Sequence, residues 1–404
     1  MRTKFLIIGA GITGCTVARL LQQRGEHDAV ILEAGSEPGG LCRTREIRGH
    51  ILDIGGGRFL CSRFPEVYEF IFSHLPRSEF NHFERVSKIS LDGHVIDYPI
   101  EFNLWQLPPE KGRGYLKSCL QAGEVDGRPQ PTSFEEWIRW RLGDRIAEAY
   151  MLPYNRKIWG VEPAEMDIDW LAKIPRVDTA AILESWRDRR FDRSRMPSHE
   201  SFYYPREGGF QRIFDAISAT VRDKIWLGRP VVRLERRGDV WRVNDEIDAE
   251  IVINTAPWTA IHAAAGNDPA LREAVDRLRI SAIVVSLYEE AYEHDWHWCY
   301  YPDEALRFHR QFFIPNYAPQ SAGGGVYRET NAKRWLPGGG EIFSYVNDAA
   351  YPIPVRGHAA AIRAVREHYS TKKLYGVGRW GQHAYHNSDV CIREAMLLVQ
   401  ALVG

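Results

Sequence analysis

The sequence predicts an α/β protein in which a Rossmann-type nucleotide-binding domain, discontinuous along the chain, carries an inserted helical domain and an antiparallel β-sheet domain. Three observations predict this class. An apolar run, a glycine turn and a helical pattern follow one another at the N-terminus; residues 249–257 have the form of a buried strand that ends in a turn; and residues 280–351 have mostly strand and loop patterns. We expect the nucleotide-binding domain at residues 1–80, 205–262 and 372–404, the helical domain at 104–204, and the sheet domain at 81–103 and 263–371.

The N-terminal stretch has the pattern of a dinucleotide-binding turn. A strand expected near residues 5–8 leads into a turn with Gly9, Gly11 and Gly14, and a helix expected over residues 12–24 follows. Glycines at these positions allow a tight turn, close approach of the backbone to a pyrophosphate, and close packing of the helix. Glu33 lies about 20 residues on, where a carboxylate binds a ribose hydroxyl. The alternative is a strand, turn and helix with no ligand.

Two further glycine clusters favour a flavin. Gly39 and Gly40, followed by Arg43, favour FAD over NAD, and Gly55 to Gly57 would let the backbone lie against a flat ring. The spacing of Glu33 and the glycine pair, after the first glycine turn, resembles the flavoprotein group that contains amine oxidases, protoporphyrinogen oxidases and UDP-galactopyranose mutases. FAD is therefore the expected cofactor, with Gly56 and Gly57 among its contacts.

Composition and charge argue against several classes of protein. The 52 Lys and Arg residues are balanced by 53 Asp and Glu residues, so no global field points to nucleic acid or to a membrane. The six cysteines include no Cys-x-x-Cys pair, and His294, His297 and His309 have no partners at ligand spacing, so neither disulfides nor a metal site are expected. No apolar run reaches the roughly 18 residues of a membrane span, and the first expected strand leaves no room for a signal peptide. A reducing cytoplasm is the simplest expected location.

Local patterns predict the elements of the first half in order. Residues 85–98 are an expected hairpin with Asp92 and Gly93 as its turn. The clearest helix begins at Thr132, where Glu135 completes a capping box, and continues to Ile146. Residues 186–200 mix charges without apolar periodicity, which predicts a solvated loop; a loop that moves over a pocket is the alternative.

The second half returns to the nucleotide-binding domain. Strands near residues 231–234 and 240–243 form another expected hairpin, in which Val232 is a candidate contact of the cofactor. A last helix is expected to begin at Asn387 and to end near Val403.

Three distant stretches, which together span most of the chain, resemble UDP-galactopyranose mutases. Residues 154–163 resemble the mutase helix that meets the nucleotide, residues 300–319 resemble the segment that supplies a tyrosine and an arginine to the substrate diphosphate, and residues 378–389 resemble the C-terminal motif at the flavin. The resemblance implies contacts with the substrate at Tyr154, Asn155, Trp159, Tyr300, Arg310, Tyr317 and Tyr385, and with the flavin at Arg379 and Asp389.

The resemblance also implies a reaction, the interconversion of pyranose and furanose forms of a nucleotide-diphosphate hexose with no net redox change. In the family, N5 of the reduced flavin displaces the nucleotide, the sugar ring opens on the flavin, and it closes through another hydroxyl before the nucleotide returns. NAD(P)H is the expected reductant.

Arginine and tyrosine side chains are expected to hold the leaving diphosphate. Arg310 with Tyr300 and Tyr385 suits that task, because a guanidinium pairs with two phosphate oxygens at once. Arg176, one or two places from the position of the family's mobile-loop arginine, is a further candidate. For each arginine, Arg379 included, the alternative is a salt bridge to a carboxylate.

The sequence departs from the family pattern at three places. Gly57 stands where the family has a histidine over the flavin, and His199 aligns with an asparagine near the leaving nucleotide. Tyr98 and Glu101 match a tyrosine and a glutamine beside the uracil. An ionised glutamate only accepts hydrogen bonds; guanine offers it two adjacent N–H donors, whereas the acceptors of uracil would face an unpaired buried charge. We therefore hypothesise a GDP-sugar in place of a UDP-sugar; the alternative pairs Glu101 with a nearby basic side chain.

Two other functions stay open. The flavin motifs serve an amine or protoporphyrinogen-type oxidase equally well, although that assignment leaves the stretches around Arg310 and Tyr385 unexplained. A non-catalytic binding protein on the same fold, as Rab-GDP-dissociation inhibitors are, conflicts with the intact phosphate turn and Glu33. The sequence does not decide which sugar is bound or whether the chain forms homo-oligomers.

Overall fold

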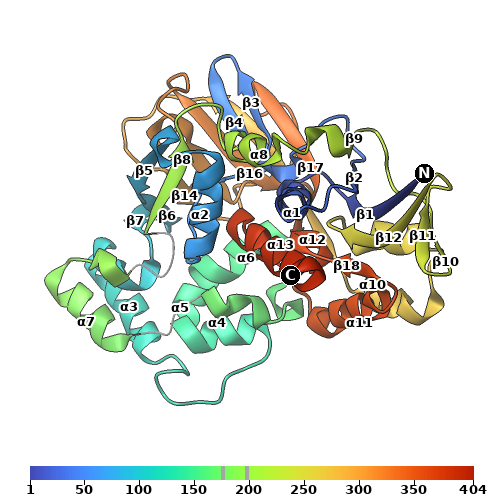
Figure 1. Ribbon diagram of the computed structural model, residues 1–404. Coiled ribbons are helices and arrows are strands. Elements are labelled where there is room, and N and C mark those ends of the chain that lie inside the picture. The colour runs from blue at the N-terminus through green and yellow to red at the C-terminus, as the bar shows by residue number, and fades with distance from the viewer. Residues whose placement is uncertain (174–177, 196–199) are drawn as a thin grey trace.

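The computed structural model describes residues 1–173, 178–195 and 200–404 (Figure 1). Its first sheet has the order β10-β11-β12-β1-β2-β9, with β18 paired to β12. The strands are β1 (Arg2–Ile8), β2 (Ala29–Leu32), β9 (Ile225–Trp226), β10 (Leu234–Arg237), β11 (Val240–Val243), β12 (Ile247–Asn254) and β18 (Leu374–Gly376). Both β2 and β12 are parallel to β1, so the expected return of a later strand to this sheet is confirmed. The sheet thus takes its strands from three separate parts of the chain, while the domain boundaries stay a prediction.

Helices cover this sheet as the apolar pattern predicts. Phe5, Leu6 and Ile7 are fully buried, as in a central parallel strand with both faces covered. The first helix, α1 (Ile12–Gln23), packs against α8 (Gln211–Ser218) and α13 (Ser388–Val403). The last helix follows Asn387 as expected, although the Asn387 side chain makes no capping hydrogen bond.

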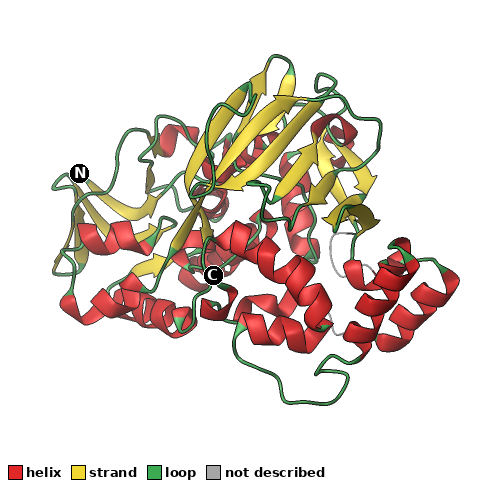
Figure 2. Cartoon of the chain, turned by 180° about the vertical axis from the view of Figure 1, so that it is seen from behind, coloured by secondary structure: helices red, strands yellow, loops and turns green. Residues whose placement is uncertain are grey.

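The second sheet has the order β17-β13-β16-β15-β14-β6-β7 and stands as a broad layer beside the helices in Figure 2. Its strands are β6 (Ser87–Leu91), β7 (His94–Asp97), β13 (Ile280–Glu289), β14 (Trp298–Tyr300), β15 (Arg310–Phe313), β16 (Gly325–Asn331) and β17 (Phe343–Pro352). The hairpin β6-β7 turns through Asp92 and Gly93, both with positive φ, as predicted. It joins the later strands through β6, which pairs in parallel with β14.

Two small sheets connect these layers. One pairs β3 (Thr44–Ile47) with β4 (His50–Asp53), and the other pairs β5 (Phe80–Glu84) with β8 (Ser201–Pro205). Asp53 lies at the junction, where it accepts hydrogen bonds from the Thr44 and Tyr204 hydroxyls. Burial raises the pKa of Asp53 to about 6, although these hydrogen bonds lower it in part.

A group of helices lies at one end of the molecule, away from β1, β11 and β12 (Figure 1). They are α3 (Pro109–Leu120), α4 (Phe134–Leu142), α5 (Asp144–Ile146), α6 (Leu152–Trp159) and α7 (Thr179–Asp188). Three sequence predictions were wrong in local detail. The helix predicted to continue to Ile146 is interrupted at Gly143, whose φ is 79°, between α4 and α5. The cap of α4 is Ser133, whose side chain accepts from the backbone N–H of Glu136, one residue later than the predicted pair. The predicted loop begins later, because α7 continues to Asp188 and places Trp186 against Gly112 of α3.

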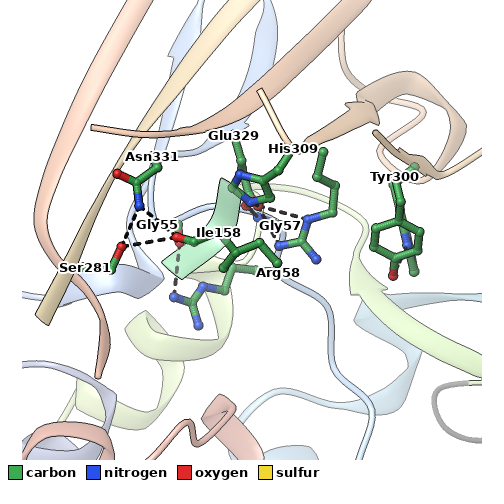
Figure 3. A network of polar contacts seen from close by, with 11 residues as sticks. Gly55, Gly57, Arg58, Ile158, Ser281, Tyr300, His309, Glu329 and Asn331 are labelled. Atoms are coloured by element: carbon green, nitrogen blue, oxygen red, sulfur yellow. Dashed lines mark hydrogen bonds and ion pairs between the residues drawn. The ribbon is translucent and has the colours of Figure 1, made fainter. Parts of the chain in front are cut away.

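A π-helical turn, Ala147–Met151, joins α5 to α6. Proline at position 153 has no backbone N–H and would crowd the preceding turn of a regular helix, and the wider turn absorbs this break. At its other end α6 is fastened to the second sheet, because buried Asn331 donates to the carbonyl of Ile158 and to the hydroxyl of Ser281 (Figure 3).

The remaining helices are α2 (Pro65–His74), α9 (Trp258–Ala264), α10 (Arg272–Asp276), α11 (His358–Ser370) and α12 (Gly378–Gly381). Helix α2 packs against α8 and α13, while α11 and α12 contact β18 of the first sheet. Among the residues that the structure describes, no helix combines the length and the apolar character needed to cross a membrane.

Candidate cofactor and substrate site

A cavity of about 490 Å³ lies at the C-terminal ends of β1 and β2. It occupies the crevice in which open α/β sheets bind nucleotides. Its lining includes Gly9, Gly11, Glu33, Gly39, Gly40, Arg43, Arg58, Val231, Tyr345, Asn347 and Arg379. Five residues predicted to contact the cofactor are not among its lining residues, namely Gly14, Gly56, Gly57, Val232 and Asp389.

Each of the three glycines of the turn is required for a different structural reason. Gly9 has φ +100°, a conformation that glycine adopts without strain. A Cβ on Gly14 would lie 2.0 Å from the carbonyl oxygen of Gly9, so α1 packs closely only because residue 14 has no side chain. A Cβ on Gly11 would meet no atom within 4 Å, and this backbone therefore faces the cavity, where α1 begins. Such an open helix N-terminus suits an anion.

Glu33 supports the turn and also lines the cavity. One carboxylate oxygen accepts the backbone N–H of Ala10 at 2.8 Å, and the other accepts that of Gly35 at 2.9 Å. Each carboxylate oxygen has a second lone pair, so Glu33 retains acceptors for a ligand hydroxyl.

Two arginines predicted to meet the cofactor are held in different ways. Arg43 forms an ion pair with Glu37 at 2.8 Å and donates to the hydroxyl of Tyr345 at 2.6 Å. Arg379 is buried and donates three hydrogen bonds, two to the carbonyl of His386 and one to that of Ala350, at 2.7–2.9 Å. The salt bridge considered for Arg379 is therefore not formed with any described carboxylate.

Val231, not Val232, lines the cavity. The side chain of Val232 is 69% exposed, and its backbone N–H donates to Asn244. The expected strand begins later, at Leu234. Residues 231 and 232 therefore lie outside it, and the rule that successive side chains of a strand point to opposite faces does not apply to them. Arg229 and Pro230 line the cavity beside Val231.

The glycine loop after β4 packs against the second sheet (Figure 3). The N–H of Gly57 donates to Oε1 of Glu329 at 2.6 Å, and a Cβ on Gly57 would lie 1.9 Å from Cζ of Phe312. No side chain fits at residue 57, which accounts for the departure noted in the sequence. Of this loop, the side chain that reaches the cavity is Arg58, which sequence reasoning missed.

Most of the predicted substrate residues lie in an aromatic cluster that consists of two groups of packed rings. Arg310 lies close enough to interact electrostatically with Tyr154 and Tyr300 of one group and with Tyr351 of the other. Tyr300 packs against Tyr98 and Tyr154, with ring centroids 5.7 and 5.4 Å apart. Tyr385 packs against Trp159 at 5.6 Å and against Tyr351 at 5.3 Å, and the guanidinium of Arg379 lies over the Tyr385 ring. Arg379 thus belongs to both the cavity lining and the cluster.

Arg310 lies in this cluster and has a buried carboxylate partner. Its Nε and Nη2 atoms are 2.9 and 2.6 Å from Oε2 of Glu329, so the salt bridge considered as an alternative is present. Burial would raise the pKa of Glu329, but Arg310 and His309 together lower it to about 2. No sequence signal indicated this pair, because Glu329 stands among the polar residues Arg328, Thr330 and Asn331 in β16 and nothing in that pattern marks it as buried.

The predicted base-binding residues lie beside a second buried arginine that the sequence did not indicate. The guanidinium of Arg85 lies 4.2 Å from the ring centroid of Tyr98 and donates to the Tyr300 hydroxyl at 3.0 Å. Glu101 is half-buried in a 3₁₀ turn and forms no ion pair with any described residue, so the basic partner considered for it is not seen. Burial raises the pKa of Glu101 to about 7.

Two other predicted residues, Asn155 and Tyr317, have internal partners. Asn155 donates to the carbonyl of Met151 and accepts the indole N–H of Trp159, so both ends of its amide are used within α6. Tyr317 is 4% exposed and packs against Tyr204, apart from the aromatic cluster. Arg176 and His199 lie outside the described residues.

A second cavity, of about 650 Å³, adjoins the C-terminal motif. Tyr385 and Asp389 line it, together with Asp169 and His358. Asp167, Asp169 and His358 offer ligand atoms within 4.8 Å of one another, a grouping that does not include the three histidines considered in the sequence.

Comparisons with known proteins agree with this geometry. A family model described as an NAD(P)-binding Rossmann-like domain matches residues 7–73. The chain is 23% identical over 177 residues to a probable UDP-galactopyranose mutase of Klebsiella pneumoniae, and 25% identical over 180 residues to dTDP-fucopyranose mutase of Escherichia coli. These alignments cover 42% and 43% of this chain and 44% and 46% of the relatives, so the chain matches less than half the length of either.

Solved structures extend the likeness over the whole chain. A crystal structure of reduced UDP-galactopyranose mutase has a TM-score of 0.88 at 21% identity, covering 100% of this chain and 94% of that one. A putative protoporphyrinogen oxidase from Exiguobacterium has a TM-score of 0.73 at 16% identity, covering 99% and 98%. The fold is therefore one that this mutase and this oxidase have in common. The chain has the fold of UDP-galactopyranose mutase and is similar in sequence to two pyranose mutases, so the predicted resemblance is confirmed.

Proposed function

We propose that this chain is an FAD-dependent mutase that interconverts the pyranose and furanose forms of a nucleotide-diphosphate hexose. The observation that carries the proposal is the meeting of tyrosines and arginines from separate segments beside a nucleotide-type cavity. The members of this cluster are Tyr98, Tyr154, Tyr300, Arg310, Tyr351, Tyr385 and Arg379. The similarity to two named pyranose mutases supports it.

The residues present fit FAD. The open backbone at Gly11 suits the pyrophosphate, Glu33 suits a ribose hydroxyl, and Arg58 and Arg379 place positive charge in the same cavity. When bound and reduced, the flavin supplies a nucleophilic nitrogen for the anomeric carbon of the sugar. NAD(P)H is the proposed reductant, and a reducing cytoplasm, consistent with six cysteines that include no Cys-x-x-Cys pair, is the proposed location.

Arg310 and Tyr300 are the proposed holders of the diphosphate. Glu329 occupies Nε and Nη2 of Arg310, which leaves Nη1, on a side chain 15% exposed, for a phosphate oxygen. The Tyr300 hydroxyl accepts N–H groups of Arg85 and Trp298, so its own proton points elsewhere and suits a phosphate acceptor. Tyr385, from the other side of the cluster, is the proposed third contact.

The base is proposed to be guanine. Glu101 is half-buried, has no basic partner among the described residues, and stands close enough to Tyr98 to influence its ionisation. Two adjacent N–H donors of guanine would satisfy this carboxylate, whereas a pyrimidine with acceptors at the same edge would leave it unpaired. The two named relatives act on pyrimidine nucleotides, so this choice would set the chain apart from them.

The activity is tested with purified protein that has been loaded with FAD and reduced with dithionite. We expect conversion of a nucleotide-hexose to its furanose form, followed by chromatography, with UDP-galactose, a dTDP-hexose and several GDP-hexoses as substrates. Oxidised enzyme is the control and should not turn over. Oxygen consumption with amines, and no isomerisation in any reduced sample, would favour the oxidase; a colourless protein that takes up no FAD would favour a binding protein.

The base is tested separately by calorimetric binding of GDP and UDP. Wild type is expected to prefer GDP by at least tenfold, and Glu101→Gln to lose most of that preference. Glu110→Gln, an exposed glutamate at the start of α3, is the matched control. An unchanged preference in Glu101→Gln would remove the guanine assignment without touching the mutase proposal.

A further inference from the structure

Arg58 and Arg379 place two positive charges in one cavity without an acidic partner. Arg379 donates only to backbone carbonyls. Nη2 of Arg58 donates to the carbonyl of Gly55 at 3.1 Å, and its buried Nε has no hydrogen-bond partner. Neither arginine forms an ion pair with any residue of the described chain. By contrast Arg43, which lines the same cavity, is paired with Glu37.

These two charges act on each other. Burial, and next the charge of Arg58, lower the pKa of Arg379. Like charges held together in a partly desolvated cavity are unfavourable unless an anion joins them. The carboxylates that line the cavity are Glu33, already bonded to two backbone amides, and Asp348, which is exposed. The protein therefore leaves the charge of the pair to be balanced by a ligand.

The loop that carries Arg58 is held rigidly. Glu329 accepts the N–H of Gly57, a Cβ on Gly55 would lie 1.9 Å from the carbonyl oxygen of Leu41, and Phe312 covers Gly57. Figure 3 shows Arg58 extending from this loop, with its hydrogen bond back to Gly55. A guanidinium fixed in this way is preorganised and needs little rearrangement when charge develops beside it.

We propose that Arg58, together with Arg379, stabilises the negative charge of reduced FAD, so that this chain binds the reduced cofactor more tightly than the oxidised one. The inference rests on the proposed function, because it requires FAD in this cavity. A hydride donor supplies two electrons and one proton; oxidised flavin that takes up both without a second proton carries one net negative charge on its ring. A fixed cation beside the ring favours that form, and charge near the ring is one of the means by which proteins tune flavins.

The pyrophosphate is a less suitable anion for Arg58. The turn from Gly9 to Gly14 and the N-terminus of α1 already offer backbone N–H groups that suit a phosphate in the same cavity. The charge of Arg58 acts on Cys42, which follows the second glycine pair, and on Arg379 and Cys391 of the C-terminal segment, and all three line the cavity. A contact of Arg58 with the flavin ring would strengthen binding of reduced FAD alone, whereas a contact with the pyrophosphate would strengthen binding of both redox forms equally.

The test is a spectroelectrochemical titration of FAD-loaded protein in the absence of sugar. In Arg58→Gln the preference for reduced over oxidised FAD should fall by about tenfold or more. For a two-electron couple this makes the reduction potential of the bound FAD more negative by about 30 mV. Arg58→Lys, which keeps the charge, should stay within threefold of wild type. Arg393→Gln, at a partly exposed arginine paired with Glu66, is the control and should not shift the potential.

Each remaining outcome decides a named point. A wild-type potential in Arg58→Gln overturns the inference, and so does equal weakening of both redox forms, which would assign Arg58 to the pyrophosphate. If Arg58→Gln does not fold, the spectrum of reduced wild-type protein against pH decides: a neutral, N1-protonated reduced flavin at pH 7 overturns the inference. A shifted potential with no turnover of any sugar would sink the mutase proposal alone, and a protein that binds no FAD would sink both.

Discussion

Glu329 and Arg310 form an ion pair within the second sheet, with Nη2 of Arg310 2.6 Å from Oε2 of Glu329. The other oxygen of the same carboxylate accepts the N–H of Gly57. One fully buried acid therefore fastens an arginine of the aromatic cluster to the loop that carries Arg58. The cofactor side and the substrate side of the candidate site share this single anchor.

Replacing Glu329 with glutamine should destabilise the fold strongly. The change leaves the charge of Arg310 without its partner in a desolvated place, and loss of one member of a buried pair costs about 3 to 5 kcal/mol. The double variant Arg310→Met with Glu329→Gln removes both charges and should be more stable than Glu329→Gln alone. Urea unfolding of the three proteins measures this; a double variant less stable than the single one would contradict the pairing.

The contribution of this carboxylate should also depend on pH. The pKa of Glu329 in the folded chain, about 2, lies below its usual 4.5, because Arg310 and His309 outweigh the effect of burial. A lowered pKa gives stability that is present above about pH 4.5 and is lost as the pH falls toward 2. The difference in stability between wild type and Glu329→Gln should therefore shrink as the pH falls from about 4.5 toward 2. A difference that stays constant would show that Glu329 is not ionised in the folded protein.

Residue 57 should tolerate no side chain. Alanine there would place its Cβ 1.9 Å from Cζ of buried Phe312, so the ring must move, and such overpacking costs on the order of 1 to 3 kcal/mol. Phe312→Leu should relieve part of this cost, so the double variant should lose less stability than the sum of the two single variants. Gly323→Ala, at an exposed site with open space around its Cβ, is the control and should be nearly neutral in thermal unfolding. Strictly additive effects would show that the two residues do not compete for space.

Features set by short-range chemistry were the ones that the sequence predicted well. The glycine turn, the position of Glu33, the turn at Asp92 and Gly93 and the return of β12 to β1 all follow from local patterns. The cap of α4 was misplaced because Thr132 with Glu135 and Ser133 with Glu136 satisfy the same pattern, and tertiary packing selects the second.

Long-range relationships could not be predicted in the same way. Glu329 meets Arg310 because β15 and β16 pair in a register that puts these residues opposite each other, 19 positions apart in sequence. Arg58 was overlooked because the flavin loop was aligned on its glycines, and the structure turns Gly57 away beneath Phe312. The oversight of Arg58 concerns which side of a backbone faces the cavity, a property that a shift of one residue reverses.

Val231 lines the cavity, whereas the sequence predicts this contact for Val232, and the two assignments predict different effects on cofactor binding. Aspartate at Val231 would place a charge in the lining and should weaken binding of FAD by at least tenfold. Aspartate at Val232, whose side chain is 69% exposed, should change it by less than twofold. Fluorescence titration of apoprotein with FAD measures both, and equal weakening in the two variants would restore Val232 as the contact.

Glu101 should destabilise the protein at high pH when no nucleotide is bound. Burial raises the pKa of its carboxyl to about 7, so the folded chain holds this proton more tightly than the unfolded chain does. A raised pKa gives stability that is complete below about pH 4.5 and is lost as the pH rises through 7. Glu101→Gln cannot ionise and should exceed wild type in thermal stability at pH 8.5, by on the order of 1 to 3 kcal/mol, but not at pH 4.5.

Nucleotide should reverse this order. The N–H donors of guanine would give the carboxylate the partners that the protein does not supply, so GDP at pH 8.5 should raise the melting temperature of wild type more than that of Glu101→Gln. Glu110→Gln, exposed to solvent, should match wild type at every pH and with every nucleotide. If Glu101→Gln gains no stability at pH 8.5, the Glu101 carboxylate is hydrated or paired in solution. Its burial then costs nothing that guanine could offset, and the physical reason for a guanine preference is lost.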